Sequence, residues 1–384
     1  MPRTSLLAAF RRAELRLDGS LAARIRPSRR CLHCQPEFGS GSGRCGACRY
    51  RGVVDARPSL DPAVAEVRRA VRRALTGIAA GRTAVVALSG GADSLALAAA
   101  TAFEAPRLGL RVASVTVDHG LQPGSADAAA AAAERARALG IEARVVRVDV
   151  GDDGGPEAAA RAARYAALAA AASDLEAGAV LVGHTLDDQA ETVLLGLARG
   201  SGTASLQGMA AVSDLAPGVA LLRPLLEVRR ATTRAACAAA GLDPWEDPHN
   251  TDPRFARVRV RERVLPVLES ELGPGVAAAL ARTAAQLRED AEAFDEMIDE
   301  TIEDIVEHAE AGISVSAAAL AANPAALRHR IIRHVVAAEF GASLTRSQTL
   351  EVARLVTDWS GQGPIDLPGC RARRIGGRVE FTAS

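Results

Sequence analysis

The chain has 384 residues with 46 acidic and 46 basic side chains, so its formal net charge is zero. A chain of this length exceeds what one hydrophobic core usually supports, which predicts two or three domains. The neutral balance excludes a globally basic nucleic-acid binder, so any RNA contact must come from local arginine clusters. No apolar run approaches the ~18 residues of a membrane helix and the N-terminus has no secretory pattern, so we expect no membrane partner.

All 46 basic residues are arginine, so the chain contains no lysine. This excludes a Schiff-base lysine, and it excludes the GxxxxGKS/T phosphate loop of Walker-type proteins. Any use of ATP must therefore depend on another kind of loop.

Four of the six cysteines, Cys31, Cys34, Cys45 and Cys48, have the spacing of a zinc knuckle. Two interpretations stay open: residues 1–55 are an added zinc module for RNA, or they are an upstream segment that is not translated. The other two cysteines, Cys237 and Cys370, lie far apart. This cysteine pattern is not the disulfide framework of a small secreted protein. It therefore predicts a reducing, cytoplasmic location. No metal ligands are assigned in the rest of the chain.

Residues 61–77 have the pattern of an amphipathic helix. Four short apolar runs, at 83–88, 112–118, 143–150 and 177–184, then alternate with Ala-rich helical segments. They recur about every 30 residues, which is the spacing of βαβ units. The pattern predicts an α/β fold with a parallel, Rossmann-like sheet covered by helices on both faces.

The chain changes character at a Pro- and Asp-rich joint, residues 243–253. Residues 275–340 have helical patterns, and residues 363–382 are typical of short strands joined by glycine turns. The predicted domains are an N-terminal extension (1–55), a catalytic domain (56–245), and a linker with a helical and small C-terminal substrate-recognition region (246–384).

The strongest motif directly follows the first predicted strand and precedes a predicted helix at 95–103. It consists of Ser89, Gly90, Gly91, Ala92, Asp93 and Ser94. Glycines allow a tight turn whose N–H groups converge, and the helix N-terminus adds positive charge, so the motif predicts an anion site. Asp93 would repel a phosphate unless Mg²⁺ lay between them. The alternative is a structural turn in which Asp93 or Ser94 caps the helix.

Two further polar segments follow predicted strands: one contains Asp118 and His119, the other His184, Asp188 and Glu191. The spacing of the last three places them on one helix face. Acidic residues that merely stabilise a helix N-terminus are the alternative. Because open α/β sheets bind ligands at the carboxyl ends of their strands, we expect all three segments to share one site.

The segments SGGADS (89–94), EAAARAARY (157–165), GHTLDDQAET (183–192), RPLLEVRR (223–230) and the stretch 246–269 occur in a characteristic order. In this the chain resembles the PP-loop (N-type ATP pyrophosphatase) enzymes and, more specifically, the tRNA-isoleucine lysidine synthetases, over residues 60–270. The resemblance implies a ligase that uses ATP and Mg²⁺ to join L-lysine to C2 of the wobble cytidine of tRNA-Ile with a CAU anticodon. An adenylated tRNA is the implied intermediate, with AMP and pyrophosphate released.

The resemblance also implies roles for residues. Ser89, Gly90, Gly91 and Ser94 would hold phosphates with Asp93 near magnesium, Asp188 and Glu191 would bind lysine and act in catalysis, and His184 and Arg164 would flank the intermediate. RNA contacts are expected from two arginine clusters: Arg223, Arg229, Arg230 and Arg234, and Arg254, Arg257, Arg259, Arg261 and Arg263. The implied partners are tRNA-Ile and lysine, not DNA, and the resemblance is compatible with a homodimer.

Two other functions remain open on the residues. A PP-loop tRNA sulfurtransferase would suit the paired cysteines, but it needs reactive cysteines near the ATP site, where the sequence places neither Cys237 nor Cys370. A non-catalytic nucleotide- or RNA-binding module could use the same scaffold. Such a module has no need of the acidic face between His184 and Glu191.

Overall fold

The structure is a computed structural model that describes residues 60–120, 124–151, 155–200, 202–246, 251–309 and 312–384. The chain forms two compact units: the first holds the described residues before 202 together with 208–282, and the second holds 202–207 and 283–384. The expected domain boundary at residue 245 therefore falls inside the first unit. The chain beyond the joint remains in this unit because its helices at 256–264 pack on a helix that begins at Leu186.

The first unit contains a six-stranded sheet in the order β3-β2-β1-β4-β6-β5. Its strands are β1 (Thr83–Ala87), β2 (Arg111–Asp118), β3 (Glu142–Arg147), β4 (Ala177–Leu181), β5 (Val212–Ala216) and β6 (Val219–Leu222). The four predicted strands are confirmed and are parallel to their neighbours. Two strands were not predicted: β6 joins parallel to β4, and β5 pairs antiparallel at the edge, so the sheet is mostly rather than wholly parallel.

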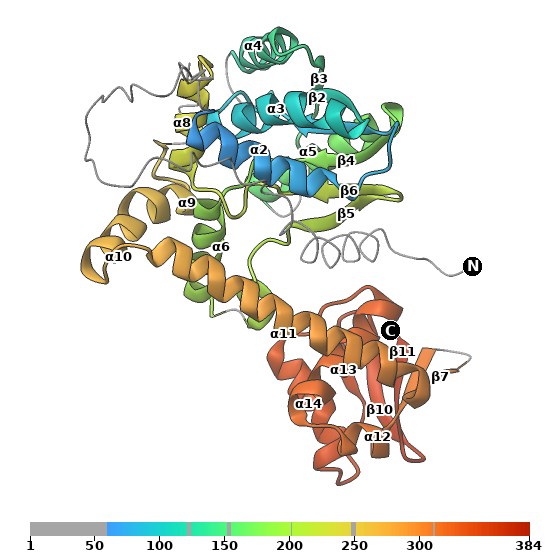
Figure 1. Ribbon diagram of the computed structural model, residues 1–384. Coiled ribbons are helices and arrows are strands. Elements are labelled where there is room, and N and C mark those ends of the chain that lie inside the picture. The colour runs from blue at the N-terminus through green and yellow to red at the C-terminus, as the bar shows by residue number, and fades with distance from the viewer. Residues whose placement is uncertain (1–59, 121–123, 152–154, 201, 247–250, 310–311) are drawn as a thin grey trace, which may run out of the picture. The chain divides into compact units, whose positions relative to one another are not determined.

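Helices cover both faces of this sheet, as the βαβ spacing predicts. Those of the first unit are α2 (Pro62–Leu75), α3 (Ala92–Glu104), α4 (Ser125–Ala138), α5 (Pro156–Asp174), α6 (Leu186–Ala198), α8 (Arg230–Ala239), α9 (Ala256–Arg259) and α10 (Leu265–Glu271). A 3₁₀ turn, Ala105–Leu108, extends α3, and a π-helical turn, Val260–Val264, links α9 to α10. The helices α2, α3 and α8 pack against one another over one face (Figure 1), and α5 covers the other.

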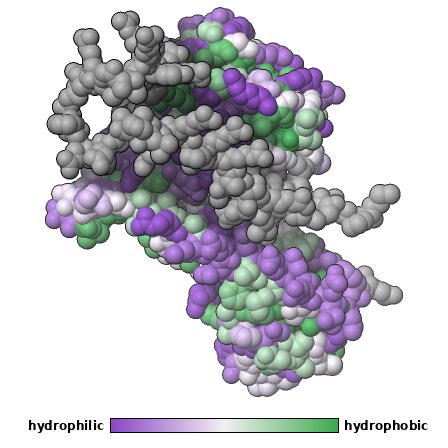
Figure 2. All heavy atoms as spheres, viewed as in Figure 1, coloured by the Kyte–Doolittle hydropathy of each residue, from purple (hydrophilic) through white to green (hydrophobic). Residues whose placement is uncertain are grey.

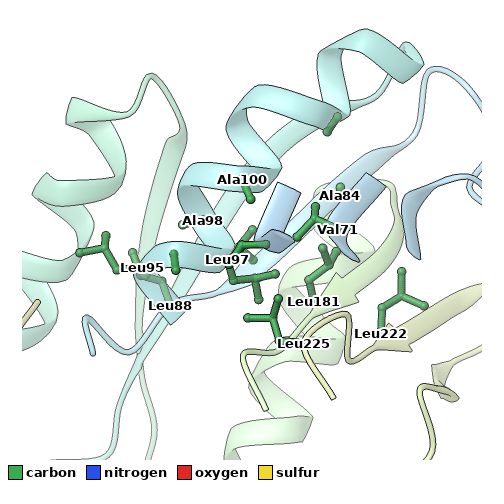
Figure 3. Packing of buried hydrophobic residues seen from close by; sticks show 14 of the residues in the cluster. Val71, Ala84, Leu88, Leu95, Leu97, Ala98, Ala100, Leu181, Leu222 and Leu225 are labelled. Carbon is green, nitrogen blue, oxygen red and sulfur yellow. The ribbon is translucent and has the colours of Figure 1, made fainter. Parts of the chain in front are cut away.

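The core explains why the strands are apolar along their whole length. Every residue of β1 is buried. Ala84 packs with Leu97 of α3 and Leu181 of β4 in one cluster (Figure 3), whereas Val85 packs with Leu168 of α5 in the cluster on the opposite face. Successive strand residues point to opposite faces, so a strand buried on both must be hydrophobic throughout. This packing fixes the carboxyl ends of β1 and β4 beside each other.

The second unit is built around a five-stranded antiparallel sheet in the order β7-β8-β11-β10-β9. Its strands are β7 (Val306–Ala309), β8 (Gly312–Ser316), β9 (Ile365–Leu367), β10 (Cys370–Ile375) and β11 (Arg378–Ala383). Its helices are α7 (Thr203–Leu206), α12 (Ala317–Ala322), α13 (Ala325–Phe340), α14 (Arg346–Thr357) and the later part of α11 (Val276–Ile305).

The predicted C-terminal strands are confirmed, but the expectation of helices throughout 275–340 is wrong at β7 and β8. Ile313 and Val315 of β8 are buried and alternate with serines, a strand pattern too short to be distinctive. The strand β8 pairs with β7, just before it in the chain, and with β11, more than sixty residues later. Pairing over that distance stabilises a strand that local sequence does not specify.

Hydrophilic and hydrophobic residues are interspersed on the visible face of each unit (Figure 2). Within the described ranges, no single helix is long and apolar enough to cross a membrane. One pair, Ala256–Glu271 with Val276–Ile305, passes by length and composition alone and is bent by 98°.

Candidate active site

The loop between β1 and α3 has the geometry of an anion site. Gly90 has φ +86°, a left-handed conformation that favours glycine. The Ser94 hydroxyl accepts the Ser89 N–H at 3.2 Å and donates to the Gly91 carbonyl at 3.0 Å, which folds the loop over the start of the helix. No side chain caps α3, so the alternative in which Asp93 or Ser94 is the N-cap is wrong. The first-turn N–H groups are left for a ligand.

The segment after β4 is fixed by a capping box at the start of α6. The Thr185 N–H and hydroxyl donate to Asp188 Oδ2 at 2.8 and 2.7 Å. Asp188 therefore stabilises the helix N-terminus, as the structural alternative proposed. Its other oxygen, Oδ1, is turned towards the cavity residue Arg230, so the carboxylate has a second function as well.

The two segments touch at Gly183. A Cβ at this position would lie 3.0 Å from both the Asp93 carbonyl carbon and the Ser94 nitrogen, which is backbone that cannot yield cheaply. Glycine therefore permits the close approach of the β4–α6 turn to the phosphate loop. This contact, between residues ninety positions apart in the chain, joins the motifs in one site.

Replacing Gly183 with alanine is expected to displace the phosphate loop, because the new methyl group overlaps its backbone. We expect ATP turnover to fall about 10- to 100-fold, as for misplacement of reacting groups by an ångström, with stability lowered by roughly 1–3 kcal/mol. Steady-state kinetics and thermal unfolding measure the two effects. Gly151→Ala is the matched control, since a Cβ there meets nothing within 4 Å. Equal kinetics for both variants would contradict the contact.

Most of the predicted residues line one cavity of about 500 Å³ at the carboxyl edge of the sheet. They are Ser89, Gly91, Ala92, Asp93, Ser94, Arg164, His184 and Asp188. Gly90, Glu191 and His119 are not among the lining residues. His119 nevertheless lies close enough for the Arg164 charge to help lower its pKa, after burial, which is the larger cause.

Glu191 does not face the cavity, contrary to the expectation that both carboxylates of α6 would meet a ligand. Its side chain is fully buried, and its carboxylate accepts from Arg261 at 2.8 and 3.1 Å and from Arg230 at 3.2 Å. Arg230 also binds Asp188 Oδ1 at 2.7 Å. Two guanidiniums thus link the carboxylates of Asp188 and Glu191 in a half-buried part of the site.

The two arginine clusters expected to contact RNA are divided by the fold. Arg230 and Arg261 belong to the buried network just described. Arg223 is 8% exposed and donates to the Ala210 carbonyl, so it supports the chain before β5. Arg254 is exposed and paired with Asp252. Spacing along the sequence groups these arginines, but the fold separates Arg223 and Arg254 from the network that Arg230 and Arg261 share.

Asp93 lies between the phosphate loop and α8. Its Oδ1 accepts a short hydrogen bond from the Thr233 hydroxyl, and Arg230 Nε lies 3.5 Å from its Oδ2. Burial raises the pKa of Asp93, partly opposed by the Thr233 and Arg230 contacts. A carboxylate in this position gains from a nearby cation. Thr233 and Arg230 were not predicted as Asp93 partners, because only packing of α8 against α3 brings them there.

His184 is held neutral. Burial lowers its pKa to about 4, with Asp188 opposing the shift and Arg223 and Arg164 adding to it. Its Nδ1 is buried and has no hydrogen-bond partner among the described residues. Burial also lowers the pKa of Arg164, which forms no ion pair with another described residue. The cavity therefore combines an uncharged imidazole with a guanidinium that no carboxylate of the described residues pairs with.

The depressed His184 pKa predicts a stability change with pH. Between its ordinary pKa of 6.5 and about 4, the unfolded chain binds more protons than the folded one, so stability falls as pH is lowered through this window. We expect wild type to lose on the order of 2 kcal/mol more than His184→Gln between about pH 7 and 4.5. Urea unfolding at both pH values measures this difference. Parallel losses in the two proteins would show that His184 does not titrate in this way.

The two described cysteines are unsuited to sulfur transfer. Cys237 is buried in α8, donates to the Ala92 carbonyl at 3.4 Å, and has its pKa raised to about 11, chiefly by burial. Cys370 is buried in the second unit and its pKa is raised for the same reason. A thiol that does not ionise is a poor nucleophile. The four N-terminal cysteines lie outside the described residues. Among the residues that the structure describes, no group of three or more His, Cys, Asp or Glu side chains could hold a metal ion.

Comparison with known families agrees with the sheet and its loop. Residues 64–268 match the family model of the PP-loop domain, and residues 316–379 match that of the TilS substrate binding domain. The fold and the site thus define an ATP-binding protein of the PP-loop class.

The tRNA(Ile)-lysidine synthase of Leifsonia xyli subsp. xyli (strain CTCB07) is 60% identical over 306 residues, which are 79% of this chain and 91% of the relative. That of Thermobifida fusca (strain YX) is 52% identical over 326 residues, 84% of this chain and 98% of the relative. The chain belongs to the tRNA(Ile)-lysidine synthase family.

A solved structure shares the fold. The U34-tRNA thiolase NcsA from Methanococcus maripaludis, with its 4Fe-4S cluster, superposes with a TM-score of 0.51 at 21% identity, covering 59% of this chain and 80% of that one. At this identity the likeness concerns the architecture alone.

Proposed function

We propose that this protein joins L-lysine to C2 of the wobble cytidine of tRNA-Ile with a CAU anticodon, consuming ATP and releasing AMP and pyrophosphate. The observation that carries the proposal is the cavity in which the phosphate loop, with its uncapped helix, meets His184, Asp188 and two half-buried arginines, Arg230 and Arg261, in a member of this family. We place the reaction in the cytoplasm, where unmodified tRNA is found with ATP.

The first step activates the base. The C2 oxygen of cytidine is a poor leaving group, so it must first attack the α-phosphorus of ATP with departure of pyrophosphate. The N–H groups of the Gly90–Ser94 turn and the α3 N-terminus suit the phosphates. Asp93 fits Mg²⁺, because its buried carboxylate adjoins the loop and one carboxylate with phosphate oxygens and waters is a usual magnesium set. When bound there, the ion would neutralise charge on the phosphates.

The second step needs a neutral amine. The lysine ε-amine has an ordinary pKa near ~10.4 and must lose its proton before it attacks C2 and displaces AMP. A guanidinium that is not neutralised, such as Arg164, disfavours a charged amine beside it and suits the phosphate of the adenylate. The low pKa of His184 makes it a poor base but a good neutral hydrogen-bond partner. Asp188, whose exposed side-chain fraction is 14%, remains within reach of a ligand.

The test is formation of AMP and lysidine from ATP, lysine and an unmodified tRNA-Ile transcript. We expect AMP release to require all three, and mass analysis of the digested tRNA to show the added lysine. A transcript with uridine in place of the wobble cytidine is the control and should give no product. AMP release without lysine incorporation, or incorporation of sulfur, would refute the proposal, and absence of any AMP would favour a non-catalytic module.

A further inference from the structure

An aromatic side chain lines the otherwise polar cavity. The protein has only two tryptophans, and one of them, Trp245, is half-buried in the cavity wall beside Ser89, Gly91 and Asp93. It lies in the joint after α8, and no motif of the sequence drew attention to it. Apart from the smaller imidazole of His184, no other aromatic ring is among the described residues that line the cavity. An indole face in a site built for phosphates, carboxylates and amines requires a separate explanation.

Trp245 is positioned by its backbone. Its N–H donates to the Gly90 carbonyl at 2.9 Å, and its carbonyl oxygen would lie 3.9 Å from a Cβ on Gly91. Two residues earlier, the Asp243 carbonyl accepts from Arg135 of α4 at 2.8 Å. The joint is thus tied to both the phosphate loop and a sheet-covering helix. Among the described residues, this attachment is made by backbone atoms of Trp245 and not by its indole, so a different side chain can occupy the same backbone.

We propose that Trp245 is the stacking platform for the cytidine that is modified, an inference that rests on the proposed function. For its C2 oxygen to reach a phosphate held by Gly90–Ser94, the cytidine must leave its neighbours in the anticodon and enter the cavity. A base taken out of a stack loses favourable contacts, and proteins replace them with an aromatic face. Trp245 offers such a face immediately beside the phosphates.

The position of Trp245 favours the cytidine over the adenine of ATP. Adenine is separated from the phosphates by its ribose, whereas the cytidine must contact the α-phosphate directly. Trp245 contacts the phosphate loop itself, through Gly90 and Gly91. A base stacked on it is therefore close to the reacting phosphorus, which is the place of the nucleophile.

The fluorescence of Trp245 tests this assignment directly. Trp359→Phe leaves Trp245 as the sole tryptophan, and phenylalanine preserves the ring face on which Arg374 lies 5.5 Å from the centroid. A non-hydrolysable ATP analogue alone is expected to leave the emission unchanged. Subsequent addition of tRNA-Ile should quench it, and a transcript with an abasic wobble position should bind without quenching. Quenching by the ATP analogue alone, or equal quenching by the abasic transcript, would overturn the assignment.

Kinetics provide a second readout. Trp245→Ala is expected to lower kcat/KM for tRNA roughly 5- to 150-fold, the range of one base–aromatic stack, while the KM values for ATP and lysine stay unchanged. Trp245→Phe should restore most of the loss, and Trp359→Ala is the matched control. If Trp245→Ala formed lysidine with an unaltered kcat/KM for tRNA, the stacking role of Trp245 would be refuted and the proposed function would stand. If the wild-type protein did not incorporate lysine but tRNA with an intact wobble base still quenched Trp245, the proposed function would be refuted and the stacking role of Trp245 would stand.

Discussion

Replacement of Asp93 by asparagine is expected to reduce AMP formation by about 10²–10³-fold while the protein remains folded. Asparagine has the same shape and still accepts the hydrogen bond from Thr233, so packing of α8 on α3 is preserved. It lacks the negative charge that a magnesium ion beside the phosphates requires. Because burial already raises the Asp93 pKa, the neutral side chain is no harder to bury than the carboxylate. Initial rates of AMP release at saturating tRNA and lysine measure the loss.

The matched control is Thr233→Val, which removes the hydroxyl donated to Asp93 and retains the carboxylate. We expect its rate to fall much less than that of Asp93→Asn, with circular dichroism and thermal unfolding close to wild type for both. If the two variants lost activity equally, the hydrogen bond and not the charge would be the important feature. Near-normal AMP formation by Asp93→Asn would remove Asp93 from the phosphate site.

The second large effect is expected for Glu191→Gln. Loss of this charge leaves Arg261 with Asp188 alone, at 3.5 Å, whereas Arg230 keeps Asp188 and Asp93. Glu191 is fully buried, and the Arg230 and Arg261 side chains are 15% and 25% exposed. Removing one partner of a buried ion pair leaves an uncompensated charge, so we expect roughly 2–3 kcal/mol of destabilisation, reduced from the fully buried case by the residual exposure of the arginines. We also expect the KM for lysine to rise more than the KM for ATP, since the arginines no longer hold Asp188 in position. Urea unfolding and separate titrations of lysine and ATP measure these effects.

The double variant Glu191→Gln with Arg261→Gln separates the two consequences. It also removes Arg261, the guanidinium that loses its close partner when Glu191 is neutralised. Most of the lost stability should therefore return, as a coupling free energy between the two positions. If lysine use also returned to normal, Glu191 would act only by neutralising Arg261. Persistent weak use of lysine with normal ATP affinity would support the lysine-binding role that the family resemblance implies. An equal deficit for both substrates would place Glu191 in support of the whole site.

Much of the fold could be predicted because it depends on local signals. The four apolar runs are strands, since a strand buried on both faces must be hydrophobic along its length, as in β1. The glycines of the phosphate loop were recognisable because a left-handed turn such as that at Gly90 leaves few other choices. The strands β5, β6, β7 and β8 were missed, since each has only four or five residues and depends on pairing with neighbouring strands of its sheet.

The sequence by itself determined the motifs of the site: the anion loop at Ser89–Ser94, the polar segment from His184 to Glu191, and their place after parallel strands. Only the tertiary structure decided what these side chains face. It turned Glu191 away from the cavity onto Arg230 and Arg261, and it brought Trp245 to the phosphate loop. The physical reason is that helix periodicity and strand order fix which residues share an edge. The partner of a buried charge, by contrast, depends on contacts between elements far apart in the chain: Arg230 of α8 is 39 residues from Glu191, and Arg261 of the π-helical turn is 70 residues from it.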